Sequence, residues 1–331
     1  MNSKNKTNRI LVTGGAGYIG SHTVRELEQA GYRPVTFDNL SEGHREAVVA
    51  GEFAKGDLSN EPGLDELFAK YEFSDVVHFA SRCYVGESME NPSRYYEENV
   101  GNALRLFRVM LKNDVRRFIL SSTCATYGNP VKIPIDEEHP QNPVNPYGET
   151  KYFIERILRH YDRAYGMKFV SLRYFNAAGA SEDALIGESH DPETHLLPLI
   201  LDVAAGREKG ITIFGDDYST DDGTCVRDYI HVSDLAAAHV KALRWLDHEK
   251  QSEFFNLGTG QGHSTREVVD RAGEITGMEI PFEMGPRRPG DPPVLIAASD
   301  KANRELDWFP RCSDLSTILR TAWAWEQKRR Y

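Results

Sequence analysis

Short apolar runs alternate with stretches of helical periodicity through the first half of the chain. Six strand-like runs lie at residues 10–13, 33–38, a run closed by 55–58, 75–80, 117–122 and 168–173. Strands that alternate with helices pair in parallel, with helices on both faces of the sheet. The pattern therefore predicts an α/β fold with a doubly wound parallel sheet.

Beyond about residue 180 the alternation loosens, and prolines interrupt it at positions 192, 198, 281, 286, 289, 292 and 293. This composition predicts a smaller, interleaved C-terminal α/β domain. We expect domains at 1–180 and 181–331, with segments near 225–260 returning to the first, because the runs 229–232 and 254–258 are apolar.

A glycine-rich turn follows the first predicted strand. Gly15, Gly17 and Gly20 match the G-x-G-x-x-G pattern of Rossmann domains. The first glycine makes the tight turn, the second lets the backbone approach a pyrophosphate, and the third lets the helix pack against the strand. The helix that follows directs its positive N-terminal end toward the anion. The motif predicts a dinucleotide site, although such turns also occur for packing alone.

Acidic residues end the next two strands. Asp38 follows the glycines by about 20 positions, where a carboxylate accepts hydrogen bonds from the adenosine ribose and repels a 2′-phosphate. It therefore favours NAD over NADP, and its alternative role is to cap the turn through Asn39. Asp57 is expected near the adenine, with a helix N-cap role as the alternative.

The composition excludes several classes of protein. The 331 residues are 40% hydrophobic, enough for a large core, and the net charge of −11 argues against nucleic acid or an anionic membrane as partner. The four cysteines have no paired or zinc-like spacing, which favours a reduced cytoplasm. Residues 1–9 do not resemble a signal peptide, and no apolar run has membrane-spanning length.

A candidate acid/base pair opens a later helix. Tyr147 and Lys151 are four residues apart and share one helix face. Tyrosine ionises near pH 10 in water, so a neighbouring ammonium is needed to favour the phenolate at neutral pH. Thr123, at the end of the fifth predicted strand, can place a hydroxyl between this base and a substrate. A surface lysine on an amphipathic helix is the alternative interpretation of the pair.

From about residue 10 to residue 325 the chain resembles the UDP-glucose 4-epimerases, which are extended short-chain dehydrogenases/reductases. The resemblance is carried by the glycine-rich turn, by the Thr123, Tyr147 and Lys151 set, and by three later motifs. These motifs are Arg-Tyr-Phe-Asn-Ala-Ala-Gly at 173–179, Gly-Thr-Cys-Val-Arg-Asp-Tyr-Ile-His at 223–231 and Arg-Arg-Pro-Gly-Asp at 287–291.

The resemblance implies roles for individual residues. Tyr147 would be the catalytic base, Lys151 its partner, and Thr123 a hydrogen-bonding hydroxyl. The cofactor-binding residues would be Gly14, Gly17, Tyr18, Ile19, Gly20, Asp38, Asn39, Asp57, Leu58, Phe79, Ala80, Asn99, Tyr147, Lys151 and Tyr174. The substrate-binding residues would be Thr123, Tyr147, Asn176, His195, Leu196, Phe214, Arg227, Arg288, Asp291 and Leu295.

The activity implied by the resemblance is reversible, NAD-dependent 4-epimerisation of UDP-galactose to UDP-glucose through a 4-keto sugar. Leu295 falls where relatives carry a residue that controls admission of N-acetylated sugars, and its intermediate size allows some UDP-N-acetylhexosamine activity. Cys83 stands where many relatives have a lysine, so Arg82 is a candidate for that charge. The family's homodimer, formed through helices near 94–111 and 152–165, is expected as well.

Several alternatives stay open on the sequence. UDP-xylose/UDP-arabinose epimerisation uses the same chemistry at C4. A 4,6-dehydratase or a decarboxylating relative would need a carboxylate where this chain has Cys124 and Ala125. A non-catalytic Rossmann binding protein would have no need of the tyrosine and lysine. No metal site is expected, because His190 and His195 do not match a zinc motif and no third ligand is evident.

Overall fold

The computed structural model describes residues 8–288 and 291–331. Pro289 and Gly290 of the arginine-rich motif, and residues 1–7, lie outside the described residues. The chain forms two compact units. The first contains the residues up to Thr126, Asn145–Arg173 and Ala236–Phe255, and the second contains Tyr127–Val144, Tyr174–Leu235 and Asn256–Tyr331. Each unit is described by itself.

The principal sheet has seven strands in the order β11-β6-β5-β4-β1-β2-β3. Their bounds are β1 Arg9–Thr13, β2 Arg33–Asp38, β3 Glu52–Lys55, β4 Asp75–His78, β5 Arg117–Thr123, β6 Lys168–Tyr174 and β11 Glu253–Leu257. The ladders that join β3, β2, β1, β4 and β5 are parallel. The six predicted strands and the doubly wound α/β fold are confirmed.

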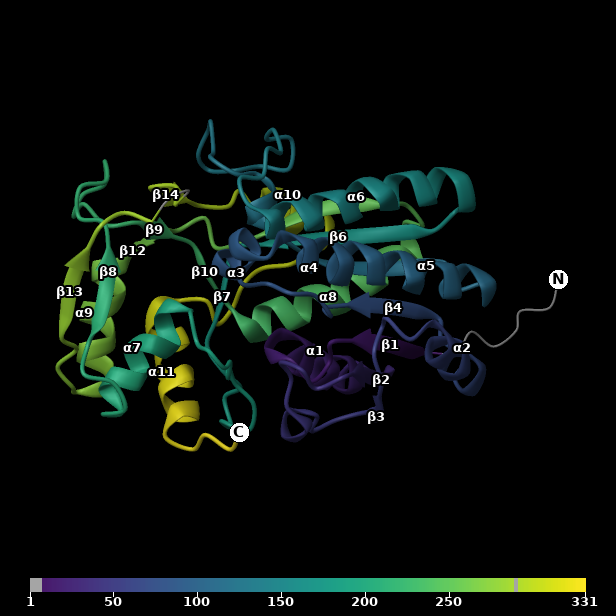
Figure 1. Ribbon diagram of the computed structural model, residues 1–331, viewed down its shortest axis with the longest axis horizontal. Helices are drawn as coiled ribbons and strands as arrows, with labels where there is room; N and C mark the ends of the chain where they lie inside the picture. Colours follow the sequence, from purple (N-terminus) through teal and green to yellow (C-terminus); the bar gives the residue numbers. More distant parts are fainter. Residues whose placement is uncertain (1–7, 289–290) are drawn as a thin grey trace. The chain divides into compact units, whose positions relative to one another are not determined.

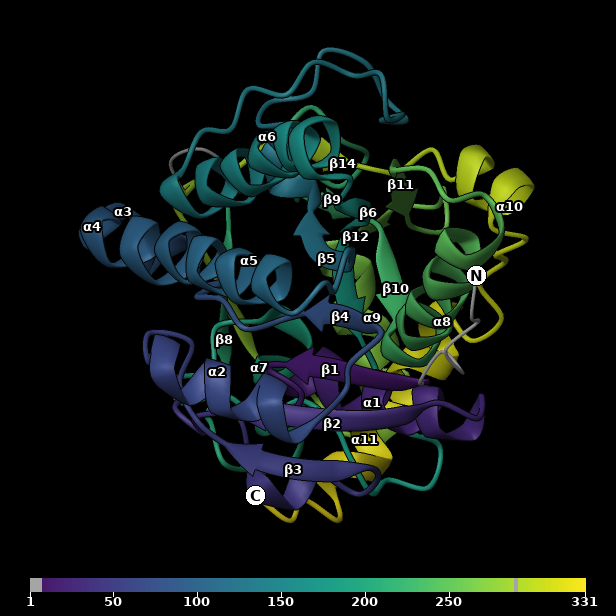
Figure 2. The ribbon, with the colours of Figure 1, turned by 90° about the vertical axis from the view of Figure 1, so that its right-hand side faces the viewer.

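Helices cover both faces of this sheet. They are α1 Tyr18–Gln29, α2 Glu61–Lys70, α5 Asn102–Lys112, α6 Pro146–Tyr165 and α8 Val232–His248. Figures 1 and 2 show α2, α5 and α6 on one face and α1 and α8 on the other. This division follows from right-handed crossovers that run in opposite directions from β1.

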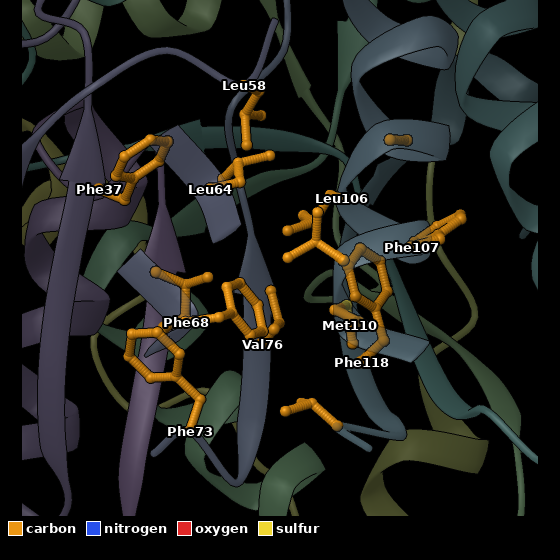
Figure 3. Packing of buried hydrophobic residues seen from close by; sticks show 14 of the residues in the cluster. Phe37, Leu58, Leu64, Phe68, Phe73, Val76, Leu106, Phe107, Met110 and Phe118 are labelled. Atoms are coloured by element: carbon orange, nitrogen blue, oxygen red, sulfur yellow. The ribbon is translucent and has the colours of Figure 1, made fainter. Parts of the chain in front are cut away.

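The core under α2 and α5 shows why these segments are helical. Leu64 and Phe68 of α2, and Leu106 and Met110 of α5, recur at a spacing of four residues and belong to one hydrophobic core that includes Val76 of β4 and Phe118 of β5 (Figure 3). The side chain of Asn60 caps α2 by accepting a hydrogen bond from the Gly63 N–H at 3.2 Å.

The helix that ends in α5 contains a π-helical segment. Two short helices, α3 Val85–Glu90 and α4 Pro92–Tyr95, precede it, and η2 Tyr96–Gly101 has π-helical hydrogen bonds before α5 begins. A π segment shifts the helix face by inserting a residue, and such segments are frequent at functional sites. Here the segment contains Glu98 and Asn99.

The second unit contains small sheets and three longer helices. Its strands are β7 Asn176–Ala178, β8 Ile211–Phe214, β9 Val226–Arg227, β10 Tyr229–His231, β12 His263–Ser264, β13 Phe282–Gly285 and β14 Val294–Leu295. They form the sheets β10-β7, β12-β9-β14 and β13-β8. The helices α7 Leu196–Ala204, α9 Thr265–Thr276 and α11 Leu315–Glu326 share a hydrophobic core (Figure 1), and a short α10 spans Asp300–Glu305.

The apolar runs 229–232 and 254–258, which were both expected to return to the first domain, form strands of two different sheets. The run near residue 255 forms β11 at the edge of the principal sheet, whereas β10 pairs in parallel with β7. No helix within residues 8–288 or 291–331 is both long enough and apolar enough to cross a membrane.

Candidate functional site

The glycine-rich turn begins one residue earlier than the G-x-G-x-x-G alignment predicts. Gly14, at φ +72°, is the left-handed residue, and its carbonyl accepts a hydrogen bond from the Gly17 N–H at 3.2 Å. A Cβ on Gly14 would lie 2.5 Å from the Ala80 backbone nitrogen. Gly15 instead faces the Thr36 side chain. The assignment of the tight turn to Gly15 was therefore wrong, and the operative pattern is G-x-x-G-x-x-G from Gly14.

At Gly17 neither the backbone conformation nor a neighbouring protein atom requires glycine. Its φ is −79°, which any residue adopts, and the nearest atom to a Cβ built on it is the Gly14 carbonyl oxygen at 3.4 Å, an ordinary contact. The protein itself therefore does not exclude a side chain here. Gly17 lines a cavity at the N-terminus of α1, so the space beside it fits a ligand that approaches the backbone.

The cavity beside the turn has a volume of about 560 Å³ and lies within the first unit. Eight of the predicted cofactor residues line it, namely Gly14, Gly17, Asp38, Asn39, Asp57, Leu58, Phe79 and Ala80. They come from the carboxyl ends of β1, β2 and β4 and from the segment after β3. This is the edge where Rossmann domains bind a dinucleotide.

Asp38 fixes the turns on either side of the cavity, and its contact with a cofactor ribose stays a prediction. Its carboxylate accepts hydrogen bonds from the Ala16 N–H at 3.0 Å and from the Leu40 N–H at 2.8 Å, so it fixes the glycine-rich turn and the following loop. Burial raises the pKa of Asp38, and the two backbone donors oppose that rise. Because the residue also lines the cavity, it is placed to meet a ribose.

Asp57 does not cap the helix that follows. Its carboxylate accepts hydrogen bonds from the Asn39 side chain at 2.6 Å and from the Ser59 N–H at 2.8 Å, while Asn60 is the N-cap of α2. Burial acts to raise the pKa of Asp57, but hydrogen bonds from Ser59 and Asn39 outweigh it and lower the pKa. The two predicted adenosine-side residues Asn39 and Asp57 thus form one hydrogen-bonded wall of the cavity.

Arg82 faces the same cavity but is already neutralised. Its guanidinium forms ion pairs with Glu42 and with Glu98, the latter at 2.8 Å. The suggestion that Arg82 replaces the missing lysine charge therefore has little support from this geometry. Asn99 holds the same segment by accepting from the Arg82 N–H at 2.7 Å and donating to Thr150 Oγ1 at 3.0 Å.

Tyr147 and Lys151 lie one turn apart at the start of α6. The helix begins there because the Asn145 side chain accepts a hydrogen bond from the Gly148 N–H at 2.8 Å. The Lys151 ammonium is almost fully buried and donates to the Ser121 carbonyl at 2.8 Å. Thr123, two residues further along β5, ends the same strand.

Burial lowers the pKa of Lys151 to about 8, although Cys83 and Glu155 act in the opposite direction. Burial, with a further contribution from the Lys151 charge, lowers the pKa of His78 to about 3. His78 Nδ1 lies 2.7 Å from Thr13 Oγ1. The buried Lys151 ammonium, next to a neutral His78, is suited to stabilise a negative charge on Tyr147, one helical turn away.

The buried carboxylate of Glu155 anchors this part of α6 to the principal sheet. Glu155 accepts hydrogen bonds from Ser122 and Ser171 at 2.7 and 2.8 Å, and it pairs with Arg173 through contacts of 2.9 and 2.7 Å. Both members of the ion pair have 1% side-chain exposure. The network joins α6 to β5 and β6, one turn after Lys151.

In the second unit several predicted substrate residues converge. Asp291 lies 3.2 Å from the Arg288 Nε and 3.7 Å from an Arg227 guanidinium nitrogen. Arg288 stacks over the Phe214 ring at 4.7 Å, and Leu295 of β14 pairs with Arg227 of β9. Two guanidinium groups and an aromatic ring suit a nucleotide with phosphates and a flat base.

The remaining predicted substrate residues occupy separate positions in that unit. Asn176 begins β7, and its N–H donates to the Asp228 carbonyl at 3.0 Å. Leu196 is the first residue of α7, and His195 is its N-cap. His195 Nδ1 lies 3.0 Å from carboxylate oxygens of Glu188 and Glu193, which raise its pKa well above the ordinary value even though burial opposes this.

Sequence reasoning missed other residues of these sites. The cavity is also lined by Ser41, Glu42, Glu98, Asn102 and Arg105. The first two lie in a loop, Glu98 lies in the π segment, and Asn102 and Arg105 lie in the first turn of α5, and no motif marks any of them as a binding residue. Glu155 was missed because its partners come from two strands that are distant in sequence.

A doubly wound sheet, a glycine-rich turn and a nucleotide-sized cavity define a dinucleotide-binding Rossmann protein. Residues 10–258 match the model of the NAD dependent epimerase/dehydratase family, and the chain belongs to this family.

Relatives with known structures and names agree with this assignment. The UDP-glucose 4-epimerase of Lacticaseibacillus casei is 50% identical over 319 residues, which cover 96% of each chain. The structure of UDP-glucose 4-epimerase from Brucella ovis in complex with NAD matches with a TM-score of 0.93 at 50% identity, over 96% of this chain and 98% of that one. The enzyme from Bifidobacterium longum, in complex with NAD⁺ and UDP, matches with a TM-score of 0.92 at 38% identity, over 97% and 98%.

Proposed function

We propose that the protein catalyses NAD-dependent, reversible 4-epimerisation of a UDP-hexose, with UDP-galactose and UDP-glucose as the principal pair. The observation that carries the proposal is the buried Lys151 ammonium, one helical turn from Tyr147 in α6. This ammonium donates to Ser121 of β5, the strand that ends at Thr123. The three relatives named above are UDP-glucose 4-epimerases that are 38–50% identical to this chain, and they support the same activity.

In this mechanism Tyr147, as a phenolate, takes the proton of the sugar 4′-hydroxyl and later returns it. The Lys151 ammonium favours the phenolate electrostatically, and Thr123 donates or accepts a hydrogen bond at the same oxygen. A bound NAD would supply the hydride acceptor and donor for C4′, which would leave the reaction redox-neutral overall.

Binding of the two nucleotides is assigned to different residues. The cofactor would be held by the turn from Gly14 to Gly20, by Asp38 and by the wall of Asn39 and Asp57. Arg227 and Arg288 would hold the UDP phosphates, with Asp291 at the ribose and Phe214 near the uracil. A UDP held firmly while the sugar is held loosely would let the ring present either face.

The test is a substrate panel with the purified protein and no added oxidant or reductant. We expect UDP-galactose to be converted fastest, with slower conversion of UDP-N-acetylgalactosamine because Leu295 is of intermediate size. Failure to convert UDP-galactose, UDP-N-acetylgalactosamine and UDP-xylose, even with NAD added, would refute the proposed activity. Faster conversion of UDP-xylose would assign the protein to pentose epimerisation.

The pKa of Lys151 predicts the alkaline limb of the pH profile. Since its pKa is lowered to about 8, the ammonium form predominates below that pH and is lost above it. We expect kcat/KM to fall as the pH rises through about 8, because the phenolate loses its stabilising charge. Initial rates between pH 6 and pH 10 measure this limb, and a flat profile up to pH 10 would contradict the role of Lys151.

We expect a side chain at Gly17 to weaken cofactor binding while the protein still folds. Gly17→Ala should weaken NAD binding by about tenfold or more, because a methyl group would occupy the space beside the turn. NAD affinity is measured by calorimetry, and unfolding by thermal scans. Gly86→Ala is the matched control, because no atom lies within 4 Å of a Cβ there. Equal NAD affinity of the two variants would refute the pyrophosphate site.

We also propose a cytoplasmic homodimer. The four cysteines are free thiols, which suits a reducing compartment. Val85, Met89 and Tyr96 are exposed on the helices before α5, and apolar side chains at such positions favour association. Light scattering after gel filtration measures the mass, and a monomer at micromolar concentration would contradict the dimer.

A further inference from the structure

The segment before α7 gathers four side chains that can bind a cation. Glu188, His190, Glu193 and His195 each offer one ligand atom, and these atoms lie within 4.8 Å of one another. The sequence showed no third ligand for the two histidines, because the glutamates are brought to them by an irregular loop. The geometry points to a single Zn²⁺ site in this loop, a site that goes beyond the proposed epimerisation.

The distances between the ligand atoms fit a tetrahedral ion. His195 Nδ1 lies 3.0 Å from oxygens of both Glu188 and Glu193, and His190 Nδ1 lies 3.5 and 3.4 Å from oxygens of the same two residues. Metal–ligand bonds of 2.0–2.1 Å in a tetrahedron place the ligand atoms about 3.3 Å apart. Three of these separations join a single set of atoms, namely Glu188 Oε1, Glu193 Oε1 and the two Nδ1 atoms, and they lie within about 0.4 Å of that value. The fourth, from His190 Nδ1, is made to the other Glu193 oxygen.

The chemistry of the donors selects the ion. Two imidazole nitrogens and two carboxylate oxygens form a set that suits Zn²⁺, whereas Mg²⁺ and Ca²⁺ prefer oxygen donors alone. The Glu188 and Glu193 side chains are only 9% and 11% exposed. His195 lies 3.0 Å from both carboxylates, and a divalent cation that displaces the proton of this imidazole would balance both negative charges.

The loop is held in place by residues other than the ligands. The Trp325 indole N–H donates to the Glu188 carbonyl at 3.0 Å, and a Cβ on Gly187 would lie 2.4 Å from the Trp325 ring. Ser189 Oγ donates to the Tyr331 carbonyl at 3.2 Å. The C-terminal segment thus fixes the backbone of the first ligand, while His195, with its side chain 45% exposed, leaves a path from solvent.

The expected role of the ion is structural. His195 is the N-cap of α7, and Leu196, the first residue of that helix, is predicted to line the nucleotide pocket. A cation bound to His195 would fix the start of α7 and with it the position of Leu196. The ion has no part in the proton transfer assigned to Tyr147.

The test measures zinc on the intact protein. The protein is treated with EDTA, incubated with zinc sulfate or magnesium sulfate, passed through gel filtration and analysed by mass spectrometry for metal. We expect about one zinc per chain and no retained magnesium, together with a higher thermal midpoint for the zinc-loaded than for the stripped protein.

Variants locate the bound ion. His190→Gln should retain less than about a tenth of the zinc and show no thermal response to it. The control is His263→Gln, because His263 lies 2.8 Å from Glu267 in a pair with only two candidate ligands, and this variant should bind zinc as the unchanged protein does. Glu193→Gln gives the same information if His190→Gln does not fold.

Two results would overturn the site. One is wild-type protein that retains no zinc and has the same midpoint with EDTA and with zinc. The other is equal zinc retention by the wild type, His190→Gln and Glu193→Gln, which would place the metal elsewhere. Epimerase activity is measured separately, so failure of the zinc site leaves the proposed function standing, and the reverse also holds.

Discussion

Tyr147→Phe should lower kcat for UDP-galactose by about a thousandfold or more, while the protein remains folded and binds NAD. A positioned general base contributes on the order of 10²–10⁴ in rate, and phenylalanine removes only the oxygen that carries the proton. The ring and the N-terminal turn of α6 are preserved, because the cap of that helix is the Asn145 side chain. Steady-state kinetics with quantified NAD content measures the effect.

The control for this variant is Tyr165→Phe, which makes the same change at the end of the same helix. Tyr165 is 51% exposed and lies at the last residue of α6. Its variant should turn over at the wild-type rate. A Tyr147→Phe rate within about threefold of that control would show that the phenol is not the base.

Arg173→Met should destabilise the fold by about 3–5 kcal/mol, because it leaves the Glu155 carboxylate buried without its counter-ion. The pair is 1% exposed on both sides, and Glu155 also accepts from Ser122 and Ser171. Methionine fills much of the space of the arginine chain, so the loss measures the uncompensated charge. Urea unfolding, followed by fluorescence and circular dichroism, measures the change.

Arg108→Met is the matched control for that prediction. It breaks the ion pair between Arg108 and Glu61, whose side chains are 55% and 39% exposed, and solvent screening leaves such surface pairs with little effect on stability. A small change for Arg108→Met and a large one for Arg173→Met are expected. Similar small changes in both variants would mean that water or another group compensates Glu155.

The fold could be predicted from the sequence because its signals are local. The strands β1, β2, β4, β5 and β6 contain short apolar runs, and α2 and α5 show apolar residues at a spacing of four. The edge strand β3 has only two apolar residues, and it was placed by the residues that follow it. The same locality misplaced the tight turn, since Gly15 matches the G-x-G-x-x-G spacing whereas the adjacent Gly14 makes the turn. Only the left-handed φ of Gly14 and its contact with Ala80 distinguish them.

The sites could be predicted only where a motif carries the chemistry. Asp38 and Lys151 belong to motifs with fixed spacing, so their types and positions indicated their roles. Glu155 depends on side chains of β5 and β6, and the Glu188 to His195 cluster depends on an irregular loop. Neither arrangement has a sequence period, which is why tertiary structure was needed to reveal them.

In the proposed reaction the hydrogen at C4′ leaves and returns without exchange with solvent. The most direct measurement is conversion of UDP-galactose in D₂O, with the product analysed by proton nuclear magnetic resonance. We predict UDP-glucose that retains protium at C4′, formed with no net accumulation of absorbance at the wavelength of the reduced cofactor. Deuterium at C4′, or product formed only when an external oxidant is supplied, would contradict the account.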